Sequence, residues 1–222
     1  LRIVGMACVA AGLALSVAAG IRGRTPSAAS PDMVEAFYIA DVASGSARWA
    51  GAKLDSGGWV KSVLAQDGGT PELRSIAPLA KESLWVADAK PAVFARPGLA
   101  VVTAKLGTGH QIAVRARNAN GGRYMRIFVK PSVDLSGIRL MGRPVAGTLK
   151  AGAWSQFVFH ASGTGEVAVT MTAARAGKLE ARMVEVRDDL PATAKAMALP
   201  PHTIPYRRAG NSMITTRTAA QW

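Results

Sequence analysis

From residue 99 onward, apolar and polar positions alternate in short runs that are separated by turn residues. A period of two residues is typical of a strand that buries one face. The connections between the runs contain Gly and Asn, as tight turns require. Regular short strands of this kind indicate an antiparallel β-sandwich with an apolar inner face and an Arg/Lys face in solvent. The expected strands are 99–105, 110–118, 123–130, 137–142, 154–161, 165–173 and 179–187.

The segment before residue 99 has less regular patterning. Residues 37–49 read as a β-hairpin around a Gly-containing turn, and 56–69 carry Trp59, Val60, Val63 and Leu64 at helical spacing between glycines. Short strands are expected at 84–87 and 92–94, and a last strand at 213–218. Residues 188–206 are Pro-rich and are expected to be irregular.

The alternation also identifies the residues that should form the core. On each expected strand the apolar positions share one side, because successive side chains point to opposite faces. Trp49 and Trp154 lie in strand patterns and are expected to be buried as well. The predicted core residues are Ile112, Val114, Ile127, Phe157, Val167, Val169 and Val184.

Residues 3–21 form a nineteen-residue run without a charged side chain. A helix of this length spans about 30 Å, the thickness of a bilayer core. A cleaved secretory signal is the alternative, because Arg2 precedes the run and small residues end it. The length of the run favours the transmembrane helix. The chain begins with Leu1, so we expect it to be the last membrane helix and following domain of a longer protein.

These patterns divide the chain into three parts. Residues 1–24 are predicted to be a transmembrane helix or signal anchor, 25–34 a linker, and 35–222 a jelly-roll-like β-sandwich domain. Arg22 and Arg24 follow the helix and would face the cytoplasm by the positive-inside rule, but missing upstream helices could override that preference. The topology therefore stays open.

Charge adds a second constraint, because the formal net charge is +13. The excess is spread over many strands and forms no block of Lys or Arg, which argues against nucleic acid and fits a surface that tolerates anionic lipid headgroups. The single cysteine, Cys8, lies in the apolar run, so no intrachain disulfide can form.

The residues that carry common catalytic chemistry do not form a recognisable motif. His110, His160 and His202 have no metal-ligand spacing, and Asp188 and Asp189 point to opposite faces if they continue a strand. Phosphate-binding loops and nucleophile elbows are missing from the sequence. We therefore predict no catalytic, cofactor-binding or metal-binding residue in this chain and no cofactor.

One stretch of the sequence resembles a known family. The run FYIADVASGSARWAG, followed by GGWVKSVL, is similar to the start of the C-terminal β-rich domain of membrane-spanning zinc exopeptidases of peptidase family 28, which include vacuolar membrane protease and endoplasmic reticulum metallopeptidase. Later segments at 140–145, 189–191 and 213–218 follow the same order. The residues that match the family pattern are Tyr38, Asp41, Gly45, Ala47, Trp49, Trp59 and Leu64.

The resemblance implies an accessory role. The family's two-zinc site needs a His-x-Asp pair and further carboxylates, and no histidine here is followed by x-Asp. It therefore implies the non-catalytic C-terminal part of such a protein, in a bacterial membrane with the domain in the periplasm. Its partners would be the lipid bilayer and an upstream or separate peptidase domain. Two alternatives remain: an exported sandwich that binds glycans or envelope polymers, and an enzyme with an unrecognised site.

Overall fold

The computed structural model describes residues 12–13, 15–16, 27–54, 58–160, 163, 165–195, 197–206 and 208–222. The predicted membrane segment 3–21 lies outside the described residues except for 12–13 and 15–16, which are helical. No helix in the described part of the chain combines the length and the apolar character that a membrane crossing requires.

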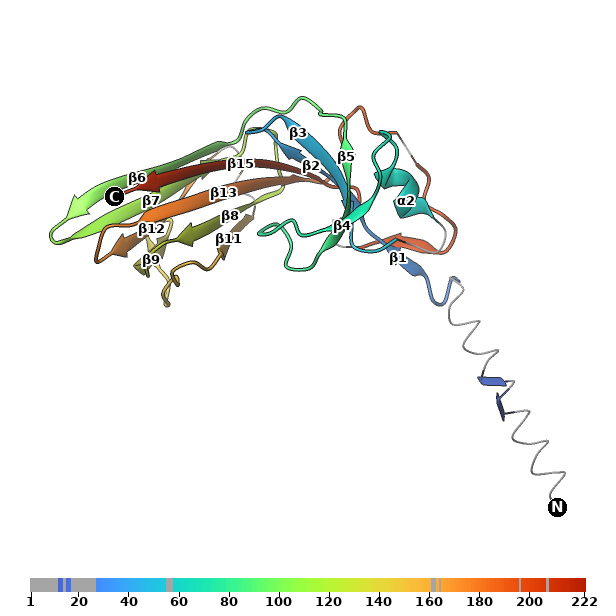
Figure 1. Cartoon of the computed structure of the whole chain (residues 1–222), viewed down its shortest axis with the longest axis horizontal. Helices are drawn as coiled ribbons and strands as arrows, with labels where there is room; N and C mark the ends of the chain where they lie inside the picture. Colours follow the sequence, from blue (N-terminus) through green and yellow to red (C-terminus); the bar gives the residue numbers. More distant parts are fainter. Residues whose placement is uncertain are drawn as a thin grey trace, which may run out of the picture.

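The described chain is mainly β, as the alternation predicts (Figure 1). Besides the helical residues 12–13 and 15–16, it contains the short helix α2, which the helical spacing around Trp59 anticipates. The elements in chain order are β1 (Asp32–Val34), β2 (Ala36–Asp41), β3 (Ser46–Gly51), α2 (Trp59–Leu64), β4 (Glu72–Arg74), β5 (Leu84–Ala89), β6 (Gly98–Leu106), β7 (Gly109–Arg117), β8 (Tyr124–Pro131), β9 (Ser136–Leu140), β10 (Arg143–Pro144), β11 (Ser155–His160), β12 (Glu166–Ala173), β13 (Lys178–Arg187), β14 (Thr203–Pro205) and β15 (Ser212–Gln221).

The strands form two main sheets and one small ribbon. The larger sheet has eight strands in the order β11-β8-β13-β15-β2-β3-β5-β4, and the smaller has five in the order β10-β9-β12-β7-β6. The ribbon pairs β1 with β14. Strands β13 and β15 run along the larger sheet from the part beside the smaller sheet to the β2–β3 hairpin (Figure 1).

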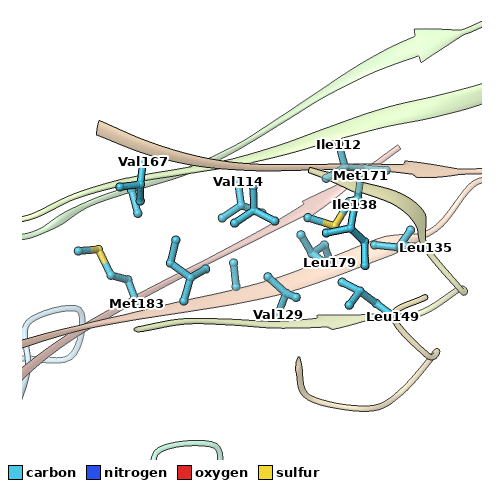
Figure 2. Packing of buried hydrophobic residues seen from close by; sticks show 14 of the residues in the cluster. Ile112, Val114, Val129, Leu135, Ile138, Leu149, Val167, Met171, Leu179 and Met183 are labelled. Carbon is cyan, nitrogen blue, oxygen red and sulfur yellow. The ribbon is translucent and has the colours of Figure 1, made fainter. Parts of the chain in front are cut away.

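The main core lies between the two sheets. Apolar side chains of β7, β9 and β12 on the smaller sheet meet those of β8 and β13 on the larger one (Figure 2). This face-to-face packing of two sheets is consistent with a β-sandwich. Six of the seven predicted core residues are buried, whereas Phe157 on β11 is only partly buried. Trp49 is buried as expected, and Trp154 is partly buried.

A second core covers the far end of the same face of the larger sheet. Strands β2 and β3 pair with Tyr38 opposite Trp49, and α2 packs on them through Val60, Val63 and Leu64. The helix is only six residues long, so its packing rather than its intrinsic propensity keeps it helical.

The expectation that each strand has one solvent face is wrong for part of the larger sheet. On β13, residues Met183 to Val186 are all buried. Met183 faces the core between the sheets, whereas Val184 and Val186 face a third cluster with Phe37, Leu84 and other apolar residues. The segment between β4 and β5 contributes Ile76 and Ala80 to this cluster, and it shields that face from water.

The predicted all-antiparallel pairing is wrong at two places. Strand β15 pairs with β2 in parallel, and β1 pairs with β14 in parallel. The first pair brings residues 38–41 beside 212–215, and the second brings 32–34 beside 203–205. Parallel pairing joins segments that are distant in sequence, so the pattern of one strand does not show it.

Several local expectations also need correction. Strand β1 lies at the end of the predicted linker 25–34, and β14 lies in the Pro-rich segment 188–206 that was expected to be irregular. Residues 92–94 form no strand. The loop 118–122, in which Gly and Asn indicate a tight turn, connects the two sheets, because β7 belongs to the smaller sheet and β8 to the larger one.

Candidate functional site

Tyr38 and Trp49, the two aromatic residues at the centre of the family resemblance, are in contact. They lie directly opposite each other on β2 and β3, and both are buried. Their ring centroids are 5.0 Å apart with an interplanar angle of 68°, an edge-to-face arrangement. Such pairs contribute about 0.5–1.5 kcal/mol beyond the area that they bury.

The polar atoms of the same two side chains tie neighbouring loops to the hairpin. The Tyr38 hydroxyl donates to the Lys90 carbonyl at 2.7 Å and accepts the Ala92 N–H at 2.8 Å. Trp49 Nε1 donates to Asp67 Oδ2 at 2.8 Å, and the same oxygen accepts the Lys90 N–H at 3.1 Å. Burial raises the pKa of Tyr38; the Ala92 N–H opposes this effect and the Asp67 charge adds to it.

The other family-pattern residues shape the same unit. Asp41 Oδ1 accepts the N–H of Ala43 at 3.0 Å and of Ser44 at 3.4 Å, and Gly45 completes the turn with a φ of 68°. Ala47 is buried beside this pair of strands, and Trp59 begins α2 and packs on the same cluster. The seven residues that match the family pattern, with Leu64 on α2 as the last of them, therefore form one hairpin-and-helix unit, within which each has a structural role.

The predicted titratable residues are not brought together. His110 lies on β7, the His160 ring is 5.5 Å from that of Tyr124, and His202 sits in the turn before β14. Asp188 pairs with Arg123, and Asp189 pairs with Arg187. No group of three or more His, Cys, Asp and Glu side chains within the described ranges is placed to hold a metal ion.

Sequence reasoning missed a set of cationic residues on the larger sheet. They lie on the face turned away from the smaller sheet, here called the outer face. Arg182 on β13 lies opposite Phe128 on β8 and Arg217 on β15. Arg182 and Arg217 occupy outward-facing positions of alternating strands, so the sequence pattern predicts that both point away from the core. The pairing of the strands must be known before these charges can be assigned to one surface.

The segment 75–82 lies across this outer face and is held there by two arginines. Arg126 Nη1 donates to the Leu79 carbonyl at 3.4 Å, and Arg182 Nη1 donates to the Ala77 carbonyl at 3.3 Å. Hollows that the segment helps to line lie on the outer face. Their volumes are about 510 and 440 Å³.

The larger of these, here called the Arg126 hollow, combines aromatic and charged groups. Its walls include Trp154, the residue before β11, and Phe128 from β8. On the outer face, the guanidinium of Arg182 is 5.2 Å and the ammonium of Lys130 is 6.0 Å from the centroid of the Trp154 ring. The lining residues are Ala77, Pro78, Leu79, Ala80, Lys81, Glu82, Arg126, Phe128, Trp154, Ser155, Gln156 and Arg208.

The two arginines of the Arg126 hollow have different surroundings. Arg208 pairs with buried Glu35, with Nε–Oε1 at 2.8 Å, and with Glu82 at 3.3 Å. Arg126 forms no ion pair with any described carboxylate, and its buried Nε has no hydrogen-bond acceptor among the described residues. Burial lowers the pKa of Arg126, a nearby Tyr124 raises it, and the positive Arg208 lowers it further.

The second hollow is more polar. Arg48, Arg182 and Arg217 contribute three cationic side chains to it, and Asp41 contributes one carboxylate. Arg48 and Asp88 form a loose ion pair at 3.9 Å. The charge excess that looks dispersed along the chain is thus partly concentrated on the outer face by strand pairing.

A third surface, at the β1–β14 ribbon, is apolar. Met33 and Ile204 lie opposite each other in the ribbon and are 47% and 45% exposed. Met197, Leu199 and Tyr206 are exposed close to β14 in the chain. A hollow of about 660 Å³ lies here, lined by Trp59, Met197, Leu199 and Pro205 among others.

Comparison with known proteins adds no relationship, because no protein-family model and no curated protein matches this chain.

Proposed function

We propose that the chain is the non-catalytic, membrane-anchored β domain of a bacterial zinc exopeptidase-like protein, related to the C-terminal region of peptidase family 28 members. The observation that carries the proposal is the hairpin-and-helix unit. Its signature residues Tyr38, Asp41 and Trp49 pack, turn and tie loops together. A non-catalytic accessory domain would share with its relatives residues that maintain its packing, and the signature residues have that role.

The membrane part of the proposal rests on the apolar run and on the ribbon. The run at 3–21 precedes β1 by about ten residues in the sequence, and β1 and its partner β14 carry the exposed apolar side chains of Met33 and Ile204. Apolar side chains near a membrane helix are stable in the interfacial region of the bilayer. We propose that this end faces the outer leaflet, with the lipid bilayer as one partner and the domain in the periplasm.

The finer fold class is also proposed. Consecutive strands from β7 to β9 alternate between the smaller and the larger sheet, and so do β11 to β13. Such crossing between two packed sheets is typical of jelly-roll-like sandwiches, and we propose this fold class for the domain at residues 35–222.

Isolation of the native protein tests the accessory role. A tag placed after Trp222 would retrieve the product that contains this chain, and mass spectrometry would identify everything joined or bound to it. We expect a domain with His-x-Asp and zinc-dependent aminopeptidase activity in the native sample. The purified 222-residue chain should hydrolyse no aminoacyl substrate, because a two-metal site needs several converging His and carboxylate ligands.

Two results would contradict the proposal. One is a native product of this chain alone with no peptidase bound to it. The other is chelator-sensitive hydrolysis by the purified chain that is lost when His110, His160 or His202 is replaced, since the chain would then itself be the enzyme.

A second candidate is an exported domain that binds glycans or envelope polymers. The Trp154 wall of the Arg126 hollow favours it, because sugar-binding sandwiches use exposed aromatic rings. Co-sedimentation of the chain with purified envelope polymer distinguishes this candidate. Retention that is lost in Trp154→Ala and kept in Trp222→Ala would support it, and equal retention of both variants would oppose it.

A further inference from the structure

The Arg126 hollow contains a cation whose charge nothing in the described protein balances. Arg126 is anchored by long hydrogen bonds to neutral acceptors, the Leu79 carbonyl at 3.4 Å and Met213 Sδ at 3.6 Å. Its guanidinium also lies 5.4 Å from the centroid of the Phe128 ring. These contacts position the group but supply no negative charge. Arg126 is half-buried, and its Nε atom is fully buried. A partly desolvated cation without an anion is costly, so the site is suited to an anion from outside.

The surroundings of Arg126 limit how much negative charge can enter. Arg208 is already compensated by Glu35 and Glu82, and the Glu82 carboxylate lines the same hollow. A dianion such as a phosphate would meet repulsion from Glu82. Lys81 also lines the hollow, but its side chain is exposed to water. A single carboxylate would balance Arg126, and its planar shape matches a guanidinium.

The side chains that line the hollow indicate the chemical character of the part of the ligand that does not contact Arg126. Phe128, Trp154 and Leu79 present rings and an aliphatic side chain next to the charged group. The volume of about 510 Å³ lies within the range of small-molecule sites. An apolar body attached to the carboxylate would bury its surface against these side chains.

We propose that the Arg126 hollow binds a small organic monocarboxylate with an apolar body, the carboxylate against the Arg126 guanidinium and the body against Trp154 and Phe128. The site is separate from the hairpin-and-helix unit, and it does not depend on the chain being part of a peptidase.

Fluorine NMR on the full 222-residue chain tests this with matched probes. 4-Fluorobenzoate carries the charge and the ring, and 4-fluorobenzamide has the same shape without the charge. We expect saturable binding of the benzoate and at least about tenfold weaker binding of the amide, since a charge-assisted pair is worth about twice a neutral hydrogen bond. N-acetylphenylalanine should compete, whereas glucuronate, an acidic sugar, should not.

Three variants locate the site. Arg126→Met should weaken benzoate binding at least about tenfold, and it should leave the unfolding midpoint unchanged or raised, because an uncompensated charge is removed. Trp154→Leu should weaken the benzoate and the amide alike. Arg74→Met removes an exposed arginine outside the lining and should bind like the parent chain.

The proposal is overturned if benzoate and benzamide bind equally, or if Arg126→Met retains full benzoate affinity. It is also overturned if the parent chain shows no saturable binding up to about 10 mM, where a millimolar ligand would fill the site. Tight binding of glucuronate, together with no binding of benzoate, would refute the proposal that the ligand has an apolar body. If Arg126→Met does not fold, Arg126→Lys keeps the charge but not the planar fork, and unchanged benzoate affinity in that variant would count against the guanidinium–carboxylate contact.

Discussion

Glu185 on β13 holds Asn120, in the loop that crosses from one sheet to the other, through both of its carboxylate oxygens. Oε1 accepts the Asn120 main-chain N–H at 2.7 Å, and Oε2 accepts the side-chain Nδ2 at 3.0 Å. The same carboxylate accepts the N–H groups of Ala119 and Gly122 at 3.0 and 2.8 Å. Glu185 is fully buried, so this loop supplies the polar partners that its burial requires.

Replacement of Glu185 by Gln should therefore destabilise the domain. An amide nitrogen cannot accept, so two of the loop N–H groups lose their acceptor, and we expect a loss of about 2–4 kcal/mol in the free energy of unfolding. Glu180→Gln, at an exposed position of the same strand, is the control and should stay within about 0.5 kcal/mol. Urea denaturation measures both, and equal midpoints would show that the loop does not depend on the carboxylate.

Removing the hydroxyl of Tyr38 should loosen the connection between the hairpin and the loop at residues 90–92. Tyr38→Phe leaves the Lys90 carbonyl and the Ala92 N–H without this partner, and we expect it to cost about 1–3 kcal/mol. Tyr206→Phe, which removes the hydroxyl of a partly exposed ring, is the variant with which the stability of Tyr38→Phe is compared. Thermal unfolding that is unchanged in Tyr38→Phe would contradict the role of the hydroxyl.

Tyr38 also gives the domain a dependence on alkaline pH. Its folded-state pKa is raised, chiefly by burial, above the ordinary value of 10.0. The unfolded chain therefore loses this proton first, and stability should be full below pH 10 and fall as pH rises from there through the folded pKa. Absorbance titration near 295 nm should show a late-titrating component that is missing in Tyr38→Phe.

The buried pair of Glu35 and Arg208 should be costly to break from one side only. Their side chains are 3% and 12% exposed, and the Arg208 guanidinium is 4.7 Å from the centroid of the Phe37 ring. Arg208→Ala leaves the Glu35 carboxylate buried without its cation, and we expect a loss of about 3–5 kcal/mol. The exposed pair of Arg74 and Glu72 is the control, and Arg74→Ala should cost about 0–1 kcal/mol. Similar losses in the two variants would refute this difference.

The stability of the domain should depend on the large side chains that are buried between the two sheets. Ile127 is fully buried, and Ile127→Ala should cost about 2–5 kcal/mol. Val102 is 49% exposed on β6, and Val102→Ala should change stability by less than about 1 kcal/mol. Guanidinium unfolding of both variants checks the assignment of the core.

The strands were predictable because their signal is local. Ile112, Val114 and Val167 alternate with polar neighbours, and a period of two residues is visible in any short window. The hairpin around Gly45 and the helix at Trp59 carry equally local turn and spacing signals. Strands of two or three residues, such as β4 and β10, are too short for a period to be read.

The arrangement of the strands, and with it the candidate site, depends on pairings between distant segments. Arg182 and Arg217 become neighbours only because β13 pairs with β15. Arg126 donates a hydrogen bond to the carbonyl of Leu79, a residue far away in sequence, and no single strand pattern reveals that contact. The sequence therefore pointed to the family-pattern residues, which have structural roles, and missed the residues that line the hollows.

Strand β15 has a consequence for how the protein is made. It lies in the middle of the larger sheet, with β13 on one side and β2 on the other. Until residues 212–221 have been synthesised, β2, β3, β5 and β4 have no hydrogen-bonded connection to β11, β8 and β13 in that sheet. A growing chain would carry two unjoined sheet edges in the meantime, and such edges attract other strands. Completion of β15 therefore closes both edges at once, and a chain that lacks residues 212–221 is expected to aggregate.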